Sequence, residues 1–176
     1  MEDIKLTTLE RIHSAAKREF LEKGFLGASL RNIVKTAGVT TGAFYGYYDS
    51  KEKLFDALVS EQYEHIMDMY MSTQNSFKEL AAEKQQSSMG DVSANCLERM
   101  LDYMYANENE FRLILMCSEG TRYENMVHEM SEVEVQATHD FVEVMRENGI
   151  EVREIDPKLE HVLVSGMFTA FFELLI

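Results

Sequence analysis

Helical periodicity is the feature that most constrains this chain, because it runs through almost every segment. Apolar residues recur at spacings of three and four, as on one face of an α-helix, and no segment keeps the strict alternation of a half-buried strand. The segment 54–70 is an example, with Leu54, Leu58, Ile66 and Tyr70 on one side. The sequence therefore predicts an all-α fold.

Several helix boundaries can be predicted from their capping residues. Thr7 followed by Glu10 is a capping-box pattern, in which each side chain satisfies a free backbone amide. Asp156 before Pro157, the only proline, predicts the start of the last helix. We expect the polar stretch 83–91 to be a loop or a break between helices.

Composition places the chain among ordinary globular proteins. Of its 176 residues, 45% are hydrophobic and 27% are charged, which allows a sizeable core. No apolar run is long enough to span a membrane, and the first residues show no secretory signal. Cys96 and Cys117 are far apart in the sequence and fit a reducing compartment. We therefore expect a cytoplasmic protein with two buried, inert thiols, a redox pair being the alternative.

The net charge of −14 is unevenly distributed. Residues 1–54 hold nine basic and seven acidic side chains, whereas residues 55–176 hold eight basic and 24 acidic ones. Phosphates repel acidic surfaces, so the total charge alone would argue against nucleic acid. The distribution permits contact with DNA through the first part only.

Residues 29–48 have the pattern of a helix-turn-helix, with two short helices joined by a turn at Gly38. The second helix and its end, residues 40–48, contain two glycines, one alanine and three tyrosines. Small residues let a backbone approach a ligand closely, and tyrosine hydroxyls can bind phosphates or bases. A surface helix with packing tyrosines explains this composition equally well.

The segment 38–55 resembles the recognition-helix signature of the TetR (tetracycline-repressor) family of bacterial regulators. The resemblance covers about residues 7–60, and the helical layout extends it more weakly to the end. The matching residues are Gly38-Val39-Thr40, Gly42, Phe44-Tyr45, Tyr47-Tyr48 and Ser50-Lys51-Glu52-Lys53-Leu54.

The resemblance implies a three-helix DNA-binding domain at 1–54 and a helical effector-binding and dimerisation domain at 55–176. It implies that Tyr45 meets the phosphate backbone and that Lys51 pairs with a phosphate, while Gly46 departs from the larger residue usual there. The implied DNA-binding residues are Arg31, Thr40, Thr41, Gly42, Ala43, Tyr45, Tyr47 and Lys51.

Methionines are concentrated in the second domain, where eleven of the twelve lie beyond residue 66. Each one taken singly is best explained as helical core, but together they suit an adaptable apolar cavity. The resemblance implies a small-molecule effector there, which we expect to be largely apolar, with a cationic tip if carboxylates face it. The candidate lining residues are Tyr63, Met67, Tyr70, Met100, Met104, Met116 and Met130.

The last helix is apolar on both faces, which predicts burial on all sides. In the family such a helix packs in a four-helix interface between two protomers, so a homodimer is implied. The pattern stops in its middle at Ile176, and we expect one further helix to be missing. The candidate interface residues are Leu159, Val162, Leu163, Gly166, Met167, Ala170, Phe171 and Leu174.

The sequence gives little support to other classes of site. His128, Glu132 and His139 have a loose metal-like spacing, but we expect neither metal nor cofactor. No nucleophile-elbow, P-loop, zinc-protease or dinucleotide motif is present, so we expect no enzyme.

The resulting hypothesis is a repressor that releases a palindromic DNA operator when a small molecule binds its body. One alternative is a DNA-binding regulator whose body receives a protein partner or nothing. A remote alternative is a small helical enzyme or carrier.

Overall fold

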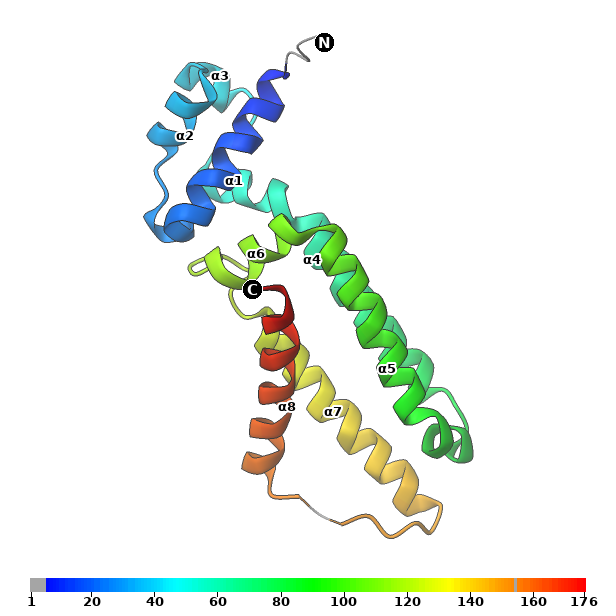
Figure 1. Cartoon of the computed structure of the whole chain (residues 1–176). Coiled ribbons are helices and arrows are strands. Elements are labelled where there is room, and N and C mark those ends of the chain that lie inside the picture. The colour runs from blue at the N-terminus through cyan, green and yellow to red at the C-terminus, as the bar shows by residue number, and fades with distance from the viewer. Residues whose placement is uncertain (1–5, 154) are drawn as a thin grey trace. The chain divides into compact units, whose positions relative to one another are not determined.

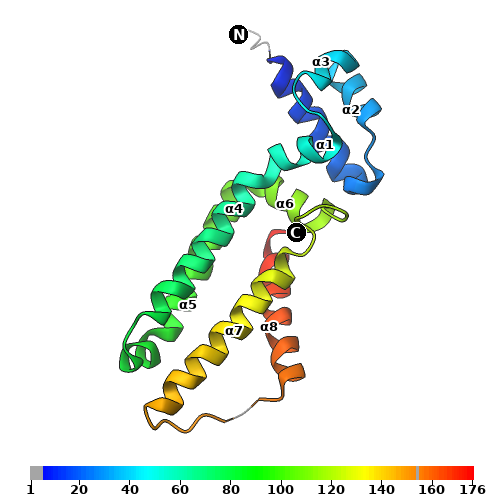
Figure 2. The same cartoon turned by 180° about the vertical axis from the view of Figure 1, so that it is seen from behind.

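The computed structural model describes residues 6–153 and 155–176, and these form helices and turns without a strand (Figures 1 and 2). The predicted all-α class is thus confirmed. The elements are α1 Thr8–Gly27, α2 Leu30–Ala37, α3 Thr41–Tyr45, α4 Lys51–Lys78, α5 Ala82–Ala106, α6 Glu108–Cys117, α7 Met126–Glu147, α8 Pro157–Phe172 and the 3-10 helix η1 Glu173–Leu175. Residues 1–5 of the expected DNA-binding domain lie outside the described residues.

Two predicted helix starts are confirmed by their capping bonds. The Thr7 backbone amide donates to the Glu10 carboxylate at 2.7 Å, and the Glu10 amide donates to the Thr7 hydroxyl at 3.2 Å. Asp156 accepts from the amides of Lys158 and Leu159, with Pro157 in the first turn. Each cap satisfies amides that a helix start leaves free.

The predicted break at 83–91 is wrong, because α5 already begins at Ala82 and runs through this stretch. The chain turns between Lys78 and Ala82 instead. The Gln85 side chain is 3% exposed, and its amide donates to the carbonyls of Lys78 and Leu80 at 3.2 and 2.9 Å. One polar side chain therefore satisfies the carbonyls at the end of α4, which helical period alone does not reveal.

The chain divides into two compact units, the first containing residues 1–63 and 108–124. It extends beyond the expected boundary at residue 54 and takes in α6. Within it, the Phe55 ring packs edge-on against Phe20 and Phe25, with centroid distances of 5.0 and 5.4 Å. Lys17 of α1 forms an ion pair with Glu110 of α6. These contacts make α1, α4 and α6 the frame on which α2 and α3 are held.

The second unit contains residues 64–107 and 125–176. Ring contacts connect its helices: His65 of α4 lies 4.2 Å from Tyr103 of α5, and Tyr70 of α4 lies 5.6 Å from Phe168 of α8. Helices α7 and α8 pack along each other (Figure 1). No helix among the described residues combines the length and apolarity needed to cross a membrane.

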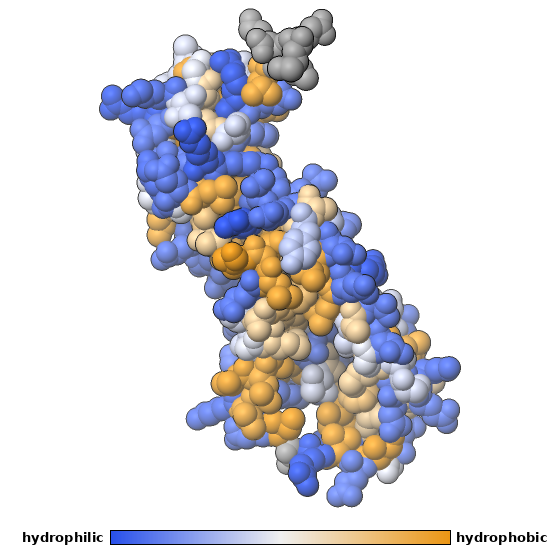
Figure 3. Space-filling model, in the orientation of Figure 1, coloured by the Kyte–Doolittle hydropathy of each residue, from blue (hydrophilic) through white to orange (hydrophobic). Residues whose placement is uncertain are grey.

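The predicted burial of the last helix on all sides is wrong for this chain by itself. Phe168, Phe172 and Leu175 are buried, but Val162 and Leu163 are 64% and 57% exposed. Figure 3 shows apolar surface along α8. The chain's own helices cover only the inner face, and the other face is exposed.

Candidate nucleic-acid interface and effector cavity

The turn between α2 and α3 depends on Gly38, which adopts a left-handed conformation with φ 63° and ψ 37°. Its amide donates back to α2, and the next residue, Val39, bonds the Val34 carbonyl at 3.2 Å. The Thr40 hydroxyl then accepts from the Ala43 amide at 3.0 Å and caps α3. Thr40 is exposed, but its hydroxyl already has this structural role.

One side of α3 faces inward. Phe44 is fully buried, as are Ile33 of α2 and Leu54 of α4 in the same unit. Its ring lies 6.0 Å from that of Tyr48, whose hydroxyl shares a hydrogen bond with His13 of α1. Burial raises the pKa of Tyr48. This hydrogen bond ties the end of α3 to α1.

The opposite side of α3 carries most of the predicted DNA-binding residues. Tyr45 and Tyr47 are 54% and 50% exposed, although large aromatic rings are usually buried. Thr41 and Gly42 are exposed beside them, and a Cβ built on Gly42 would meet no atom within 4 Å. Packing within the chain therefore does not require a glycine at position 42. A second molecule that approached this backbone closely would require one.

Charge around this surface comes from α2. Arg31 is exposed near the start of α2, as the resemblance implies, and Lys35 is exposed in its last turn. Sequence reasoning missed Lys35, although it is a second basic residue on the same short helix as Arg31. Ala43 is half-buried, so of the predicted set it has less surface to offer.

Lys51 is placed differently from expectation. Its ammonium donates to the carbonyls of Phe25 at 2.6 Å, Ala28 at 3.2 Å and Leu26 at 3.4 Å. In the structure this side chain satisfies carbonyls at the end of α1. These carbonyls need donors because α1 bends at Gly24, where φ is 67°. The predicted phosphate contact of Lys51 stays a prediction.

Arg11 is a second positioning residue that sequence reasoning missed. Its guanidinium donates to the Gly38 carbonyl and to the Thr8 hydroxyl, both at 3.4 Å. These bonds brace the turn from α1. The positive charge near Gly38 comes from a residue 27 positions earlier in the chain, so no local pattern could reveal it.

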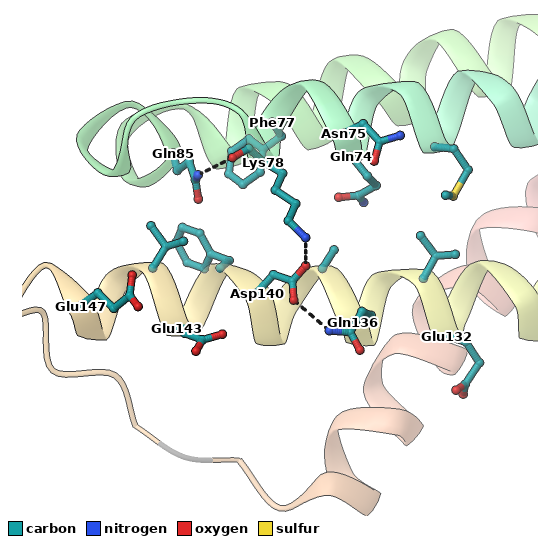
Figure 4. Close-up of a pocket in the computed structure, with 15 residues that line it drawn as sticks. Gln74, Asn75, Phe77, Lys78, Gln85, Glu132, Gln136, Asp140, Glu143 and Glu147 are labelled. Carbon is teal, nitrogen blue, oxygen red and sulfur yellow. Dashed lines mark hydrogen bonds and ion pairs between the residues drawn. The ribbon is translucent and has the colours of Figure 1, made fainter.

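The second unit contains two neighbouring cavities that share Gln74 and Phe77 of α4 and Ala137 and Phe141 of α7. The aromatic cavity, about 350 Å³, lies among α4, α5, α7 and α8. The acidic cavity, about 690 Å³, lies between α4 and α7, with Gln85 from the start of α5 at one end (Figure 4). Both volumes are within the range of about 300–1,000 Å³ that is usual for small-molecule sites.

A hydrogen-bonded group lines the aromatic cavity. The Tyr70 hydroxyl and the Gln74 amide both donate to Oε2 of Glu134, the amide at 2.7 Å. Burial and the bond to Glu134 raise the pKa of Tyr70, so the phenol remains a donor at neutral pH. Apolar residues surround this polar group, a composition typical of ligand sites.

Only Tyr70 of the seven predicted effector residues lines either cavity. Met100, Met104 and Met130 are fully buried core residues, and Met67 is half-buried. The other two, Tyr63 and Met116, belong to the first unit, where Tyr63 packs against Tyr123 and Met116 is 52% exposed.

Sequence reasoning missed the cavity's other groups, above all Glu134, Phe77 and Phe141. Phe77 lies on α4, and Glu134 and Phe141 lie two helical turns apart on α7, so their spacing could have indicated a shared face. Methionine count was a poor guide because Met100, Met104 and Met130 fill the core. The methionines that line the cavities are Met71, Met89 and Met167.

Most of the predicted interface residues of α8, and Leu174 of η1, are exposed. Leu159, Val162, Leu163, Met167 and Leu174 are between 42% and 64% exposed. Gly166 and Ala170 lie exposed between them, and Phe171 is half-buried. Small residues flanked by large apolar ones let two helices approach closely.

The remaining candidate sites hold no ligand set. Among the described residues, no group of three His, Cys, Asp or Glu side chains could hold a metal. His139 instead bonds Glu160 at 2.8 Å, which connects α7 to α8. Cys96 and Cys117 are both free and buried, and burial raises the pKa of Cys117. A raised pKa makes a thiol less reactive.

Comparison with known proteins assigns the head to a family. The profile described as "Bacterial regulatory proteins, tetR family" matches residues 12–58. The HTH-type transcriptional regulator YdgC of Bacillus subtilis is 39% identical over 57 residues, 32% of this chain and 29% of its own length. The repressor NemR of Escherichia coli is 29% identical over 114 residues, which are 65% of this chain and 47% of NemR. The matches thus span less than half of these relatives.

The fold agrees with this assignment beyond the matched segment. The TetR-family regulator PfmR of Thermus thermophilus is 20% identical and superposes with a TM-score of 0.54, covering 96% of this chain and 86% of PfmR. At that identity the likeness concerns the fold alone. The profile match thus identifies residues 12–58 as a domain of the TetR family of bacterial regulatory proteins, and the rest of the chain shares the all-helical fold of PfmR.

Proposed function

We propose that this chain is a ligand-responsive transcriptional repressor, which binds a palindromic operator as a homodimer and releases it when a small molecule occupies the second unit. The exposed side of α3, with Tyr45 and Tyr47, is the surface offered to the major groove. Arg31 and Lys35 supply charge for phosphates. Lys51 and Arg11 hold the surface in place through the carbonyls of α1 and the turn.

The exposed face of α8 supports the dimer. Five exposed apolar side chains, which include Leu159, Val162 and Leu163, would lose contact with water if a second copy covered them. A two-fold pair would place two copies of α3 about 34–36 Å apart when both contact successive major grooves. The operator is then a palindrome whose half-sites have that spacing.

The continuity of α4 is the observation that carries the proposed regulation. This helix begins at Lys51, whose ammonium holds the end of α1, and runs unbroken to Lys78. Its segment from Tyr70 to Phe77 lines the aromatic cavity. If α4 can adopt two placements, a ligand that binds one of them more tightly shifts the equilibrium toward it. The DNA-binding surface is attached to the other end of that helix.

The cavities favour a small molecule over a protein partner as the signal. A body that only packs against a protein needs no interior volume, whereas this one has an aromatic cavity of about 350 Å³. Repression is the simpler outcome of DNA binding, because a protein that covers a promoter excludes polymerase. The relative NemR is named a repressor.

A cavity-filling variant tests the regulation. Ala137 lines both cavities, and Ala137→Trp places a ring in the volume that a ligand would use. We expect compounds that release a selected operator from the wild type to lose this effect in Ala137→Trp. Ala94→Trp, at an exposed position of α5 outside both cavities, is the control. If a releasing compound acts equally on both variants, the cavities do not receive the signal.

A further inference from the structure

The aromatic cavity combines one carboxylate with several rings, which gives it a definite chemical preference. Glu134 is the one formally charged residue among the described residues that line it. Four aromatic side chains line the same space, with Tyr70 against Phe168 at 5.6 Å and Phe77 against Phe141 at 6.1 Å between ring centres. Aromatic faces and a carboxylate both attract positive charge.

The hydrogen bonds of Glu134 leave one of its oxygens available. Tyr70 and Gln74 both donate to Oε2, and within the described part of the chain no group donates to Oε1. Glutamate carboxyl groups are ionised at neutral pH, and a carboxylate has about four acceptor positions. The two existing donors hold the group in position, and neither carries a positive charge to neutralise it.

The neighbouring acidic cavity strengthens this preference. It is lined by Glu132, Asp140, Glu143 and Glu147, against the single described cation Lys78. Figure 4 shows the Lys78 ammonium directed at Asp140, which also accepts from Gln136 at 2.8 Å. Lys78 is therefore engaged, and both cavities repel an anionic ligand.

We propose that the effector is an organic monocation with an apolar body, its positive charge beside Glu134 and its apolar part among Phe77, Phe141 and Phe168. The cavity volume suits one ring system or a short branched chain. A quaternary ammonium, which has no hydrogen-bond donor, fits well because the faces of the aromatic rings attract its charge. Fatty acids and acyl phosphates are disfavoured by the same carboxylates. This inference rests on the proposed ligand response and names its chemical class.

Three ligands that share a benzyl group test it: benzyltrimethylammonium, its isosteric uncharged carbon analogue neopentylbenzene, and the smaller anion phenylacetate. Calorimetry and thermal shifts of the full chain measure binding. We expect the cation to bind about tenfold or more tighter than the anion, and added salt to weaken the cation alone. This comparison uses the wild type and so does not depend on any variant folding. Equal or tighter binding of phenylacetate overturns the proposal.

Two variants then locate the charge. Glu134→Gln keeps an oxygen to accept from Tyr70, and we expect it to lower affinity for the cation about fivefold or more, with little change for the uncharged analogue. Glu132→Gln removes the same charge from the acidic cavity and is the matched control. If Glu132→Gln lowers affinity for the cation more than Glu134→Gln does, the cation does not bind in the aromatic cavity.

Operator release separates this inference from the regulation on which it rests. If the cation binds through Glu134 but leaves operator affinity unchanged, the site is supported and the ligand response is wrong. If uncharged or anionic compounds release the operator and Glu134→Gln has no effect on release, the ligand response is supported and the cationic effector is wrong.

Discussion

The Lys51 ammonium lies 2.6 Å from the Phe25 carbonyl oxygen and 4.5 Å from the centre of the Phe25 ring. The first residue of α4 therefore holds the last turn of α1 through both a hydrogen bond and a cation–π contact. The resemblance to regulators implied a phosphate partner for this lysine. The structure assigns it a positioning role, and the two roles differ in what a substitution does.

Lys51→Met tests which role dominates. We expect it to lower the free energy of unfolding by about 1.5–3 kcal/mol, because it removes a charged donor from half-buried carbonyls. Thermal and urea unfolding measure this loss. Lys53→Met, two residues further along and exposed, is the control and should leave stability unchanged within about 0.5 kcal/mol. A phosphate role alone would leave stability intact in Lys51→Met and lower the salt dependence of DNA binding.

Tyr45→Ala should have the opposite profile. The ring is 54% exposed, so little burial is lost and unfolding should change by less than about 1 kcal/mol. Loss of one phosphate or base contact should weaken binding to operator and non-operator duplexes alike by about 1 kcal/mol, or about fivefold. Tyr45→Phe removes only the hydroxyl and so distinguishes the contribution of its hydrogen bond to DNA from that of the ring. Unchanged affinity in both variants would exclude Tyr45 from the interface.

Leu163→Glu tests the dimer face. Leu163 is 57% exposed and lies at the middle of the apolar side of α8. A carboxylate there would be buried without a partner in the dimer, so we expect a monomer in sedimentation or light scattering. Ala94→Glu adds the same charge at an exposed position of α5 and should leave association unchanged. A wild-type chain that is already monomeric at all concentrations would contradict the proposed interface.

Glycine substitutions should change stability in opposite directions. Gly38 has φ +63°, which a residue with a Cβ adopts only with strain, so Gly38→Ala should destabilise the head by about 1–2 kcal/mol. Gly90 lies inside α5, and a Cβ there meets nothing within 4 Å. Gly90→Ala should stabilise the chain by about 0.5–1 kcal/mol, measured by urea unfolding.

The pH dependence of the head should include a contribution from His13. Burial, and secondly the charge of Lys17, lower the pKa of His13 below its usual 6.5. A lowered pKa in the folded state means that the stabilising contribution is present above pH 6.5 and is lost as pH falls through the folded-state value. Thermal unfolding between pH 7.5 and 5 should therefore depend less steeply on pH in His13→Gln. An identical pH dependence of thermal unfolding in both proteins would show that His13 makes no such contribution.

Local patterns predicted the fold well and the contacts between distant residues poorly. The capping box at Thr7 and the cap at Asp156 involve side chains within three residues of their partners, so sequence order already shows them. The Gln85 cap of α4 and the Lys51 bond to Phe25 depend on how the chain returns on itself. The polar stretch 83–91 therefore predicts a loop, although Gln85 within it is buried and caps α4.

The candidate sites divide in the same way. Exposed Tyr45 and Tyr47 were predictable because the motif in α3 is local. Met104 and Met130 were not distinguishable from cavity residues, because helical period shows that a side chain faces inward and not what it meets there. Glu134 accepts a hydrogen bond from Tyr70, which lies 64 positions earlier in the chain, so no local pattern shows that the two line one cavity.

Selection of operators from random DNA duplexes tests whether the chain reads DNA through α3 as a dimer. The purified chain is bound to a random pool at physiological salt, and the enriched duplexes are sequenced. We expect a palindrome whose half-site centres are separated by about one helical turn, or 34–36 Å, and we expect Tyr45→Ala to bind the same palindrome more weakly. Recovery of unrelated sequences, or of a single half-site without symmetry, would contradict a dimeric regulator that reads DNA through α3.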